Sequence, residues 1–153
     1  MSNMQAVDIL LVEDNPTDAE LTLTALAEQR VANRVIWVTD GESALDYLFC
    51  RGAYRERDPT PPRLVLLDLK LPKIDGIEVL QALRADPMLS RLPVTMLTSS
   101  AEESDLARSY DLGVNSYVVK PVDFDQFSTE VSRLGFYWLL INHSPPYPQG
   151  RPE

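Results

Sequence analysis

Five polar residues with complementary chemistry stand at or just after the ends of four short apolar runs in this chain. They are Glu13, Asp14, Asp68, Thr98 and Lys120. Short, nearly continuous apolar runs are typical of strands buried on both faces of a parallel sheet. In open α/β sheets the ligand site lies just beyond the carboxyl ends of the strands. We therefore expect these five side chains to converge on one site.

The side chains of this set suit the transfer of a phosphoryl group to a carboxylate. A carboxylate can act as a nucleophile and form an acyl phosphate, and we assign this role to Asp68. Phosphoryl transfer depends mainly on positioning and on neutralisation of charge. The ammonium group of Lys120 would supply a fixed positive charge for the phosphoryl oxygens, and the Thr98 hydroxyl would donate a hydrogen bond to one of them.

The three acids of the set also predict a metal site. Crowded carboxylates repel one another unless a cation lies between them, and Mg²⁺ is the usual hard cation with oxygen ligands and several waters. We expect Asp14 and Asp68 to bind Mg²⁺ directly and Glu13 to bind it directly or through water. The backbone carbonyl of Lys70 would complete the protein ligands. An acid at one strand end is commonly a helix cap, so the evidence lies in the combination.

The segments between the apolar runs carry helical patterns, so strands and helices alternate five times. The predicted strands cover residues 8–13, 34–38, 64–68, 94–98 and 116–120, and the predicted helices cover 16–29, 41–49, 77–85, 102–111 and 124–142. Asn15 and Asp123 are predicted N-caps, and Gly113 is predicted to end a helix in a left-handed conformation. This alternation predicts an α/β fold with a doubly wound parallel sheet.

Composition narrows the class of protein. The 153 residues suit one domain, and the net charge of −9 argues against a general nucleic-acid binder. A single cysteine, Cys50, excludes an internal disulfide and fits a reducing compartment. No apolar run reaches the ~18 residues of a membrane helix, and the amino terminus has no signal-type segment. We expect a cytoplasmic protein with no membrane or nucleic-acid partner.

Three parts of the chain are distinguished by their composition. We expect residues 1–6 to be disordered, 7–142 to form the domain, and the proline-rich tail 143–153 to be disordered. The domain carries a long polar insert at 51–63. Loops of this length are often functional or mobile, although a solvated loop without a role is the alternative. Too few residues follow the sheet for a second, output domain.

Four motifs in this chain together resemble the receiver domain of two-component response regulators. They are Val12-Glu13-Asp14-Asn15, Leu67-Asp68-Leu-Lys-Leu-Pro72 followed by Asp75-Gly76, Thr98-Ser99, and Lys120-Pro121, and the resemblance extends over residues 7–134. It implies a flavodoxin-like fold with strand order 2-1-3-4-5 and a histidine kinase as phosphoryl donor. It also implies a cis peptide bond before Pro121.

The same resemblance implies a switch. Tyr117 would be the aromatic side chain that moves with Thr98 when the protein is phosphorylated, and the surface of residues 102–111, 116–120 and 124–142 would change. The insert and the aromatic final helix are more narrowly similar to single-domain regulators paired with bacterial phytochromes. In receivers the positions of Lys70 and Ser100 tune hydrolysis of the acyl phosphate.

The final helix has more apolar residues than one face can bury. Its stripe repeats at spacings of three and four and contains Phe124, Phe127, Val131, Leu134, Trp138 and Ile141. Phe136, Tyr137 and Leu140 lie off this stripe. A helix over 124–142 would span about 28 Å against about 17 Å for a central strand. We expect a homodimer in which Phe136, Tyr137, Trp138 and Leu140 form the interface. Burial under the amino-terminal segment or the insert is the alternative.

Other functions compatible with this type of sheet are less well supported. An aspartate-nucleophile phosphatase would carry a second acid two residues after the nucleophile, where this chain has Lys70. A flavin carrier would have a Ser/Thr/Gly-rich phosphate loop after the first strand. An interaction module that is never phosphorylated would have no need of the acids. We therefore expect a phosphorylated signalling switch and not a turnover enzyme.

Overall fold

A computed structural model describes residues 7–29, 34–121, 123–138, 143 and 145–146. Five parallel strands form one sheet in the order β2-β1-β3-β4-β5. The strands are β1 (Ile9–Val12), β2 (Val35–Val38), β3 (Leu64–Leu67), β4 (Val94–Thr98) and β5 (Ser116–Val119). The predicted α/β class, doubly wound sheet and strand order are therefore confirmed, with most strands one or two residues shorter than predicted.

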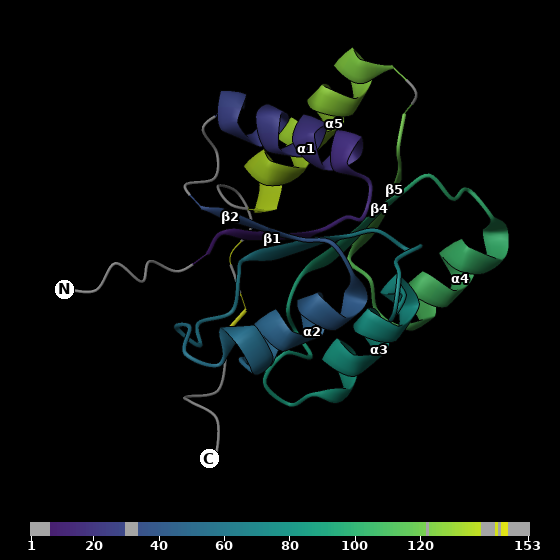
Figure 1. The fold of residues 1–153 in the computed structure, drawn as a ribbon. Coiled ribbons are helices and arrows are strands. Elements are labelled where there is room, and N and C mark those ends of the chain that lie inside the picture. The colour runs from purple at the N-terminus through teal and green to yellow at the C-terminus, as the bar shows by residue number, and fades with distance from the viewer. Residues whose placement is uncertain (1–6, 30–33, 122, 139–142, 144, 147–153) are drawn as a thin grey trace.

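Helices cover both faces of the sheet (Figure 1). They are α1 (Pro16–Gln29), α2 (Gly41–Leu48), α3 (Gly76–Ala85), α4 (Glu103–Asp111) and α5 (Phe124–Phe136). Figure 1 shows α1 and α5 together on one face and α2, α3 and α4 on the other. This arrangement buries the central strands on both sides. Each residue of β1, β3 and β4 is buried, which explains their nearly continuous apolar runs.

The predicted helix ends are observed. The Asn15 carboxamide oxygen accepts hydrogen bonds from the N–H groups of Thr17 and Asp18 at 2.9 and 3.1 Å. Asp123 accepts from the N–H of Asp125 at 3.3 Å and caps α5. Gly113 follows α4 with a φ of +79°, the left-handed conformation predicted for it. Local hydrogen bonds and backbone conformation thus determine at which residues these helices begin and end.

The 51–63 insert is held against α2. It contains a short 3₁₀-helix, Gly52–Tyr54, and the ring of Tyr54 meets Tyr47 edge-on at 5.1 Å. The guanidinium carbon of Arg57 lies 4.1 Å from the centre of the Tyr47 ring, and its Nε donates to the Tyr47 carbonyl at 2.6 Å. These contacts give the insert a defined conformation. They do not test whether the insert has a function or is a solvated loop without a role.

The final helix follows its predicted stripe as far as the structure describes it. Phe127 and Val131 are buried, and Leu134 and Trp138 pack against the apolar cluster between α1, α5 and the sheet. Tyr137 is 48% exposed. Leu140 lies outside the described residues, as do residues 1–6 and most of the tail, and the side chain of Phe136 does as well. Of the two predicted interface residues whose side chains are described, Trp138 packs partly against the core and Tyr137 is exposed.

The expected cis peptide bond before Pro121 is wrong. Lys120 and Pro121 are both described, and the structure has no cis peptide bond among such residues. The trans form is the intrinsically favoured state of an X–Pro bond by about 0.5–1 kcal/mol.

Among the described residues no helix is both long and apolar enough to cross a membrane.

Candidate functional site

The three predicted metal ligands meet at the carboxyl edge of the sheet. One carboxylate oxygen from each of Glu13, Asp14 and Asp68 lies within 4.8 Å of the other two. The cause is the register of the sheet, since Val12 pairs with Leu67 on the neighbouring strand. The residues that follow this pair, Glu13 and Asp68, therefore lie side by side. Glu13 and Asp68 are buried at 2% and 7% exposure, whereas Asp14 is exposed.

Lys120 directly follows the carboxyl end of β5, and its side chain extends to this cluster. Its backbone N–H donates to the Thr98 carbonyl at 2.7 Å, which holds the segment beside β4. Its ammonium group donates to Glu13 Oε1 at 2.5 Å and to Asp68 Oδ2 at 3.1 Å. Burial lowers the pKa of Lys120, but the hydrogen bonds to Glu13 and Asp18, together with the negative charges of Asp68 and Glu13, outweigh burial and raise that pKa above its ordinary value. The lysine is therefore a permanent cation.

Glu13 has an unusual protonation equilibrium. The pKa of its carboxyl group is raised to about 7 in total: burial is the largest cause, the hydrogen bond from Lys120 opposes it, and the nearby charge of Asp68 adds to the rise. Its other oxygen accepts from the N–H of Asn15 at 3.1 Å, so the side chain is held on both sides. A carboxyl group with such a raised pKa can lose its proton near neutral pH when a cation binds.

Two residues that sequence reasoning did not assign to the site contact it. Asp18, in the first turn of α1, accepts a hydrogen bond from Lys120 Nζ at 2.9 Å. Trp37 on the edge strand β2 donates from its indole Nε1 to the Glu13 carbonyl at 2.8 Å. The position of Asp18 in the first turn of the helix that follows β1 was the available signal. Nothing in the local pattern of Trp37 pointed to this contact.

The hydroxyl end of the site is linked to Tyr117 through Ser100. Thr98 is fully buried at the end of β4, and its Oγ1 accepts from the Ser100 N–H at 3.3 Å. The Tyr117 hydroxyl donates to the Ser100 carbonyl at 2.9 Å, and the Ser100 hydroxyl donates to Asp105 at 2.6 Å. Tyr117 is half-buried in this arrangement. The two predicted switch residues are thus connected through one residue of the β4–α4 loop.

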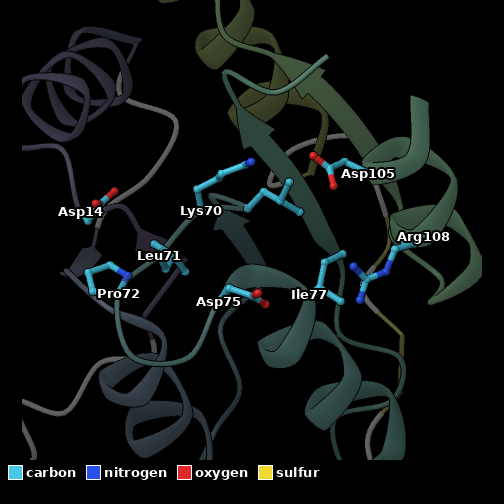
Figure 2. Close-up of a pocket in the computed structure, with 9 residues that line it drawn as sticks. Asp14, Lys70, Leu71, Pro72, Asp75, Ile77, Asp105 and Arg108 are labelled. Carbon is cyan, nitrogen blue, oxygen red and sulfur yellow. The ribbon is translucent and has the colours of Figure 1, made fainter. Parts of the chain in front are cut away.

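A cavity of about 590 Å³ opens beside the acids. Figure 2 shows Asp14 on one side, Asp105 and Arg108 of α4 on the other, and the exposed side chain of Lys70 between them. The cavity gives solvent and small solutes access to Asp14. Lys70 lies in the loop directly after Asp68, where its carbonyl was predicted to bind the metal; that ligand role stays a prediction.

The donor set fits a hard divalent cation. Three carboxylates from two adjacent strand ends offer oxygen atoms within reach of a single ion. Two of the three carboxylates, Glu13 and Asp68, are buried, and each forms an ion pair with Lys120. One ammonium group does not neutralise three acids, so the site retains a net negative charge suited to a cation.

Comparison with known proteins gives a consistent result. The family model described as "Response regulator receiver domain" matches residues 9–132. The probable methanogenesis regulatory protein FilR2 of Methanothrix harundinacea is 44% identical over 90% of this chain and 86% of its own. Response regulator Rcp1 of Synechocystis sp. is 40% identical over 86% of this chain and 88% of its own.

Solved structures agree with these matches. The phosphorylated cyanobacterial phytochrome response regulator RcpA has a TM-score of 0.86 at 41% identity and covers 93% of this chain and 100% of its own. The Mn²⁺-bound form of Rcp1 has a TM-score of 0.85 at 36% identity and covers 92% and 99%. The bacteriophytochrome response regulator AtBRR has a TM-score of 0.72 at 55% identity and covers 91% and 99%.

The narrower similarity to phytochrome-associated regulators is therefore confirmed along with the broader one. The five strands of the sheet and the three acids at the strand ends all lie within residues 9–132, the range that the family model matches. This chain belongs to the response regulator receiver domain family.

Proposed function

We propose that this protein accepts a phosphoryl group on Asp68 from a histidine kinase in an Mg²⁺-dependent reaction, and that it acts as a signalling switch. The observation that carries the proposal is the meeting of Glu13, Asp14 and Asp68 with the Lys120 ammonium group at one sheet edge. Such a set provides a nucleophile, a metal site and a fixed cation within one small volume.

The transfer step follows from these groups. A carboxylate oxygen of Asp68 attacks the phosphorus of a phosphohistidine; the new O–P bond forms as the P–N bond breaks, and the imidazole leaves. Bound Mg²⁺, held by Glu13, Asp14, Asp68 and the Lys70 carbonyl, would neutralise charge on the phosphoryl oxygens. Lys120 remains beside Asp68 to pair with one of those oxygens. The Thr98 hydroxyl would donate to another.

The switch would act through the contacts of Ser100. A phosphoryl group adds charge and strong acceptor oxygens, which would draw the Thr98 hydroxyl toward Asp68. Because Ser100 is bonded to both Thr98 and Tyr117, movement of the threonine would disturb the hydrogen bond that holds the Tyr117 hydroxyl. The expected result is a more buried Tyr117 and an altered surface of α4, β5 and α5.

This same surface supports self-association. Among the residues that the structure describes, the exposed large apolar side chains on it are Leu106, Tyr110, Val119 and Tyr137. Exposed apolar groups gathered on neighbouring elements usually mark an interface, and a symmetric homodimer is the commonest assembly. We infer a homodimer in which α5 takes part; of the predicted interface residues Phe136, Tyr137, Trp138 and Leu140, the one whose side chain is seen to be exposed is Tyr137.

The proposed partners and cellular compartment are inferred from the relatives of this chain and from its net charge. The names of RcpA and AtBRR connect those proteins with phytochromes, which supports a bacterial phytochrome as the cognate kinase. The name of FilR2 refers to methanogenesis, so other inputs occur among similar proteins. The net charge of −9 supports a protein that does not bind nucleic acid. We place it in the cytoplasm, as a phosphoacceptor and not a turnover enzyme.

The test is intact-mass measurement after incubation with acetyl phosphate. Wild-type protein in Mg²⁺ should gain one phosphoryl group, and Asp68→Asn or excess chelator should prevent the gain. Asp111→Asn, an exposed acid at the end of α4, is the control and should behave as wild type. Full phosphorylation of Asp68→Asn would contradict the assignment. Continuous release of inorganic phosphate from a phosphomonoester, in place of acetyl phosphate, would favour the phosphatase alternative.

A further inference from the structure

One carboxylate at the site has no part in the chemistry proposed above. Asp18 lies in the first turn of α1, and its Oδ2 accepts a hydrogen bond from Lys120 Nζ at 2.9 Å. Its side chain is 29% exposed, whereas that of Lys120 is 7% exposed. The lysine is thus enclosed, and Asp18 closes it off on the side of α1.

The backbone of Asp18 already performs the ordinary duties of its position. Its N–H donates to the Asn15 cap at 3.1 Å, and its carbonyl accepts from the Thr22 hydroxyl at 2.8 Å. Neither contact uses the carboxylate. The side chain can therefore be changed without removing the cap of α1, and its bond to Lys120 is a separate feature.

The three partners of Lys120 differ in what happens to them during phosphorylation. An ammonium group has three N–H donors, and here they meet Glu13 at 2.5 Å, Asp18 at 2.9 Å and Asp68 at 3.1 Å. Glu13 and Asp68 belong to the three-acid cluster that suits a cation. Asp68 is also the proposed phosphoryl acceptor. Asp18 is outside that cluster, so it is the one partner whose bond to the lysine need not change.

We propose that Asp18 is a positioning residue that anchors the ammonium group of Lys120 beside Asp68 while metal and phosphoryl group engage the other two carboxylates. The lysine side chain is a flexible four-carbon stem, and one persistent bond reduces the positions it can sample. Its consequence for phosphorylation rests on the proposed function. The anchoring itself does not, and it can be measured without metal or phosphate.

The first measurement is the chemical accessibility of Lys120. Reductive methylation of the full chain in chelator, followed by peptide mass spectrometry, gives the modification rate of each lysine. Asp18→Asn keeps the size of the side chain and removes its charge, and it should raise the rate at Lys120 on the order of tenfold, the effect of replacing an ion pair by a weaker contact with a neutral amide. Lys73, exposed on the β3–α3 loop, provides an internal reference and should not change.

The matched control is Glu20→Gln, which removes one negative charge from an exposed position of the same helix. It should leave the rate at Lys120 at the wild-type value. Thermal melting checks that both variants fold, and Asp18→Ser serves as a second variant if Asp18→Asn does not. An unchanged Lys120 rate in a folded Asp18 variant overturns the proposal, as does an equal rise in Glu20→Gln.

The second measurement is the rate of phosphorylation by acetyl phosphate in saturating Mg²⁺. Asp18→Asn should slow it on the order of tenfold, and Glu20→Gln should not. If Lys120 becomes more reactive while phosphorylation keeps its wild-type rate, the positioning role is wrong. If wild-type protein is not phosphorylated at all, the proposed function fails, and the methylation result still decides whether Asp18 anchors the lysine.

Discussion

Gly76 allows the loop that carries Asp68 to lie directly against the first turn of α3. A Cβ atom on Gly76 would lie 2.3 Å from the Asp68 carbonyl oxygen and 2.8 Å from the Leu69 Cα. Both are backbone atoms, so no side-chain rotation can relieve the contact. The Gly76 N–H also donates to the Leu69 carbonyl at 2.8 Å. Gly76→Ala must therefore move the loop and the helix apart by about 1 Å to restore van der Waals contact.

This displacement predicts losses of both stability and rate. Overpacking of this kind costs about 1–3 kcal/mol of unfolding free energy, and each kcal/mol lowers the Tm of a chain of this size by about 2–4 °C. Misplacement of a reacting group by 1 Å can slow a reaction on the order of 100-fold. We expect Gly76→Ala to melt earlier and to take up phosphate from acetyl phosphate on the order of 10- to 100-fold more slowly.

Gly113→Ala separates the two effects. Gly113 has a φ of +79° in the α4–β5 connection, at the opposite edge of the sheet from the acids. Alanine there costs about 1–2 kcal/mol of strain and should lower the Tm while leaving the phosphorylation rate unchanged. Thermal melting and intact-mass time courses measure both quantities. A folded Gly76→Ala protein with the wild-type rate, or an equal loss of rate in Gly113→Ala, would refute the reasoning.

Three further predictions concern the metal, the switch and the interface. Mg²⁺ affinity, measured by calorimetry, should rise about tenfold between pH 6 and pH 8, because the cation binds ionised Glu13, whose pKa burial raises to about 7. Glu13→Gln should remove this rise, and a wild-type affinity independent of pH would contradict the explanation. Thr98→Ala should still accept phosphate but lose the coupled change at Tyr117 and around α4, β5 and α5; an identical response of amide exchange in wild type and variant would show that the coupling is wrong. Charged residues at both Tyr137 and Leu140 should give a monomer that still folds and accepts phosphate, and sedimentation that finds wild type already monomeric at micromolar concentration would exclude the interface.

The strands and their contents could be predicted because burial on both faces leaves a simple mark on a sequence. Strands such as β3 are apolar throughout, and polar residues follow where the sheet ends. Parallel pairing then brings those endings to one edge, so the meeting of Glu13 with Asp68 needs only the order of the strands. The caps at Asn15 and Asp123 were predictable for a similar reason, since each bonds to residues two or three positions away.

Contacts between elements far apart in the chain were decided only by the tertiary structure. Asp18 and Lys120 are on different elements, and their 2.9 Å hydrogen bond depends on how α1 lies against the end of β5. The indole of Trp37 reaches the Glu13 carbonyl from an edge strand, and no local pattern marks that residue. Sequence periodicity specifies which face of an element is buried, whereas a hydrogen bond between side chains needs positions correct to a fraction of an ångström, and these result from packing of the whole domain.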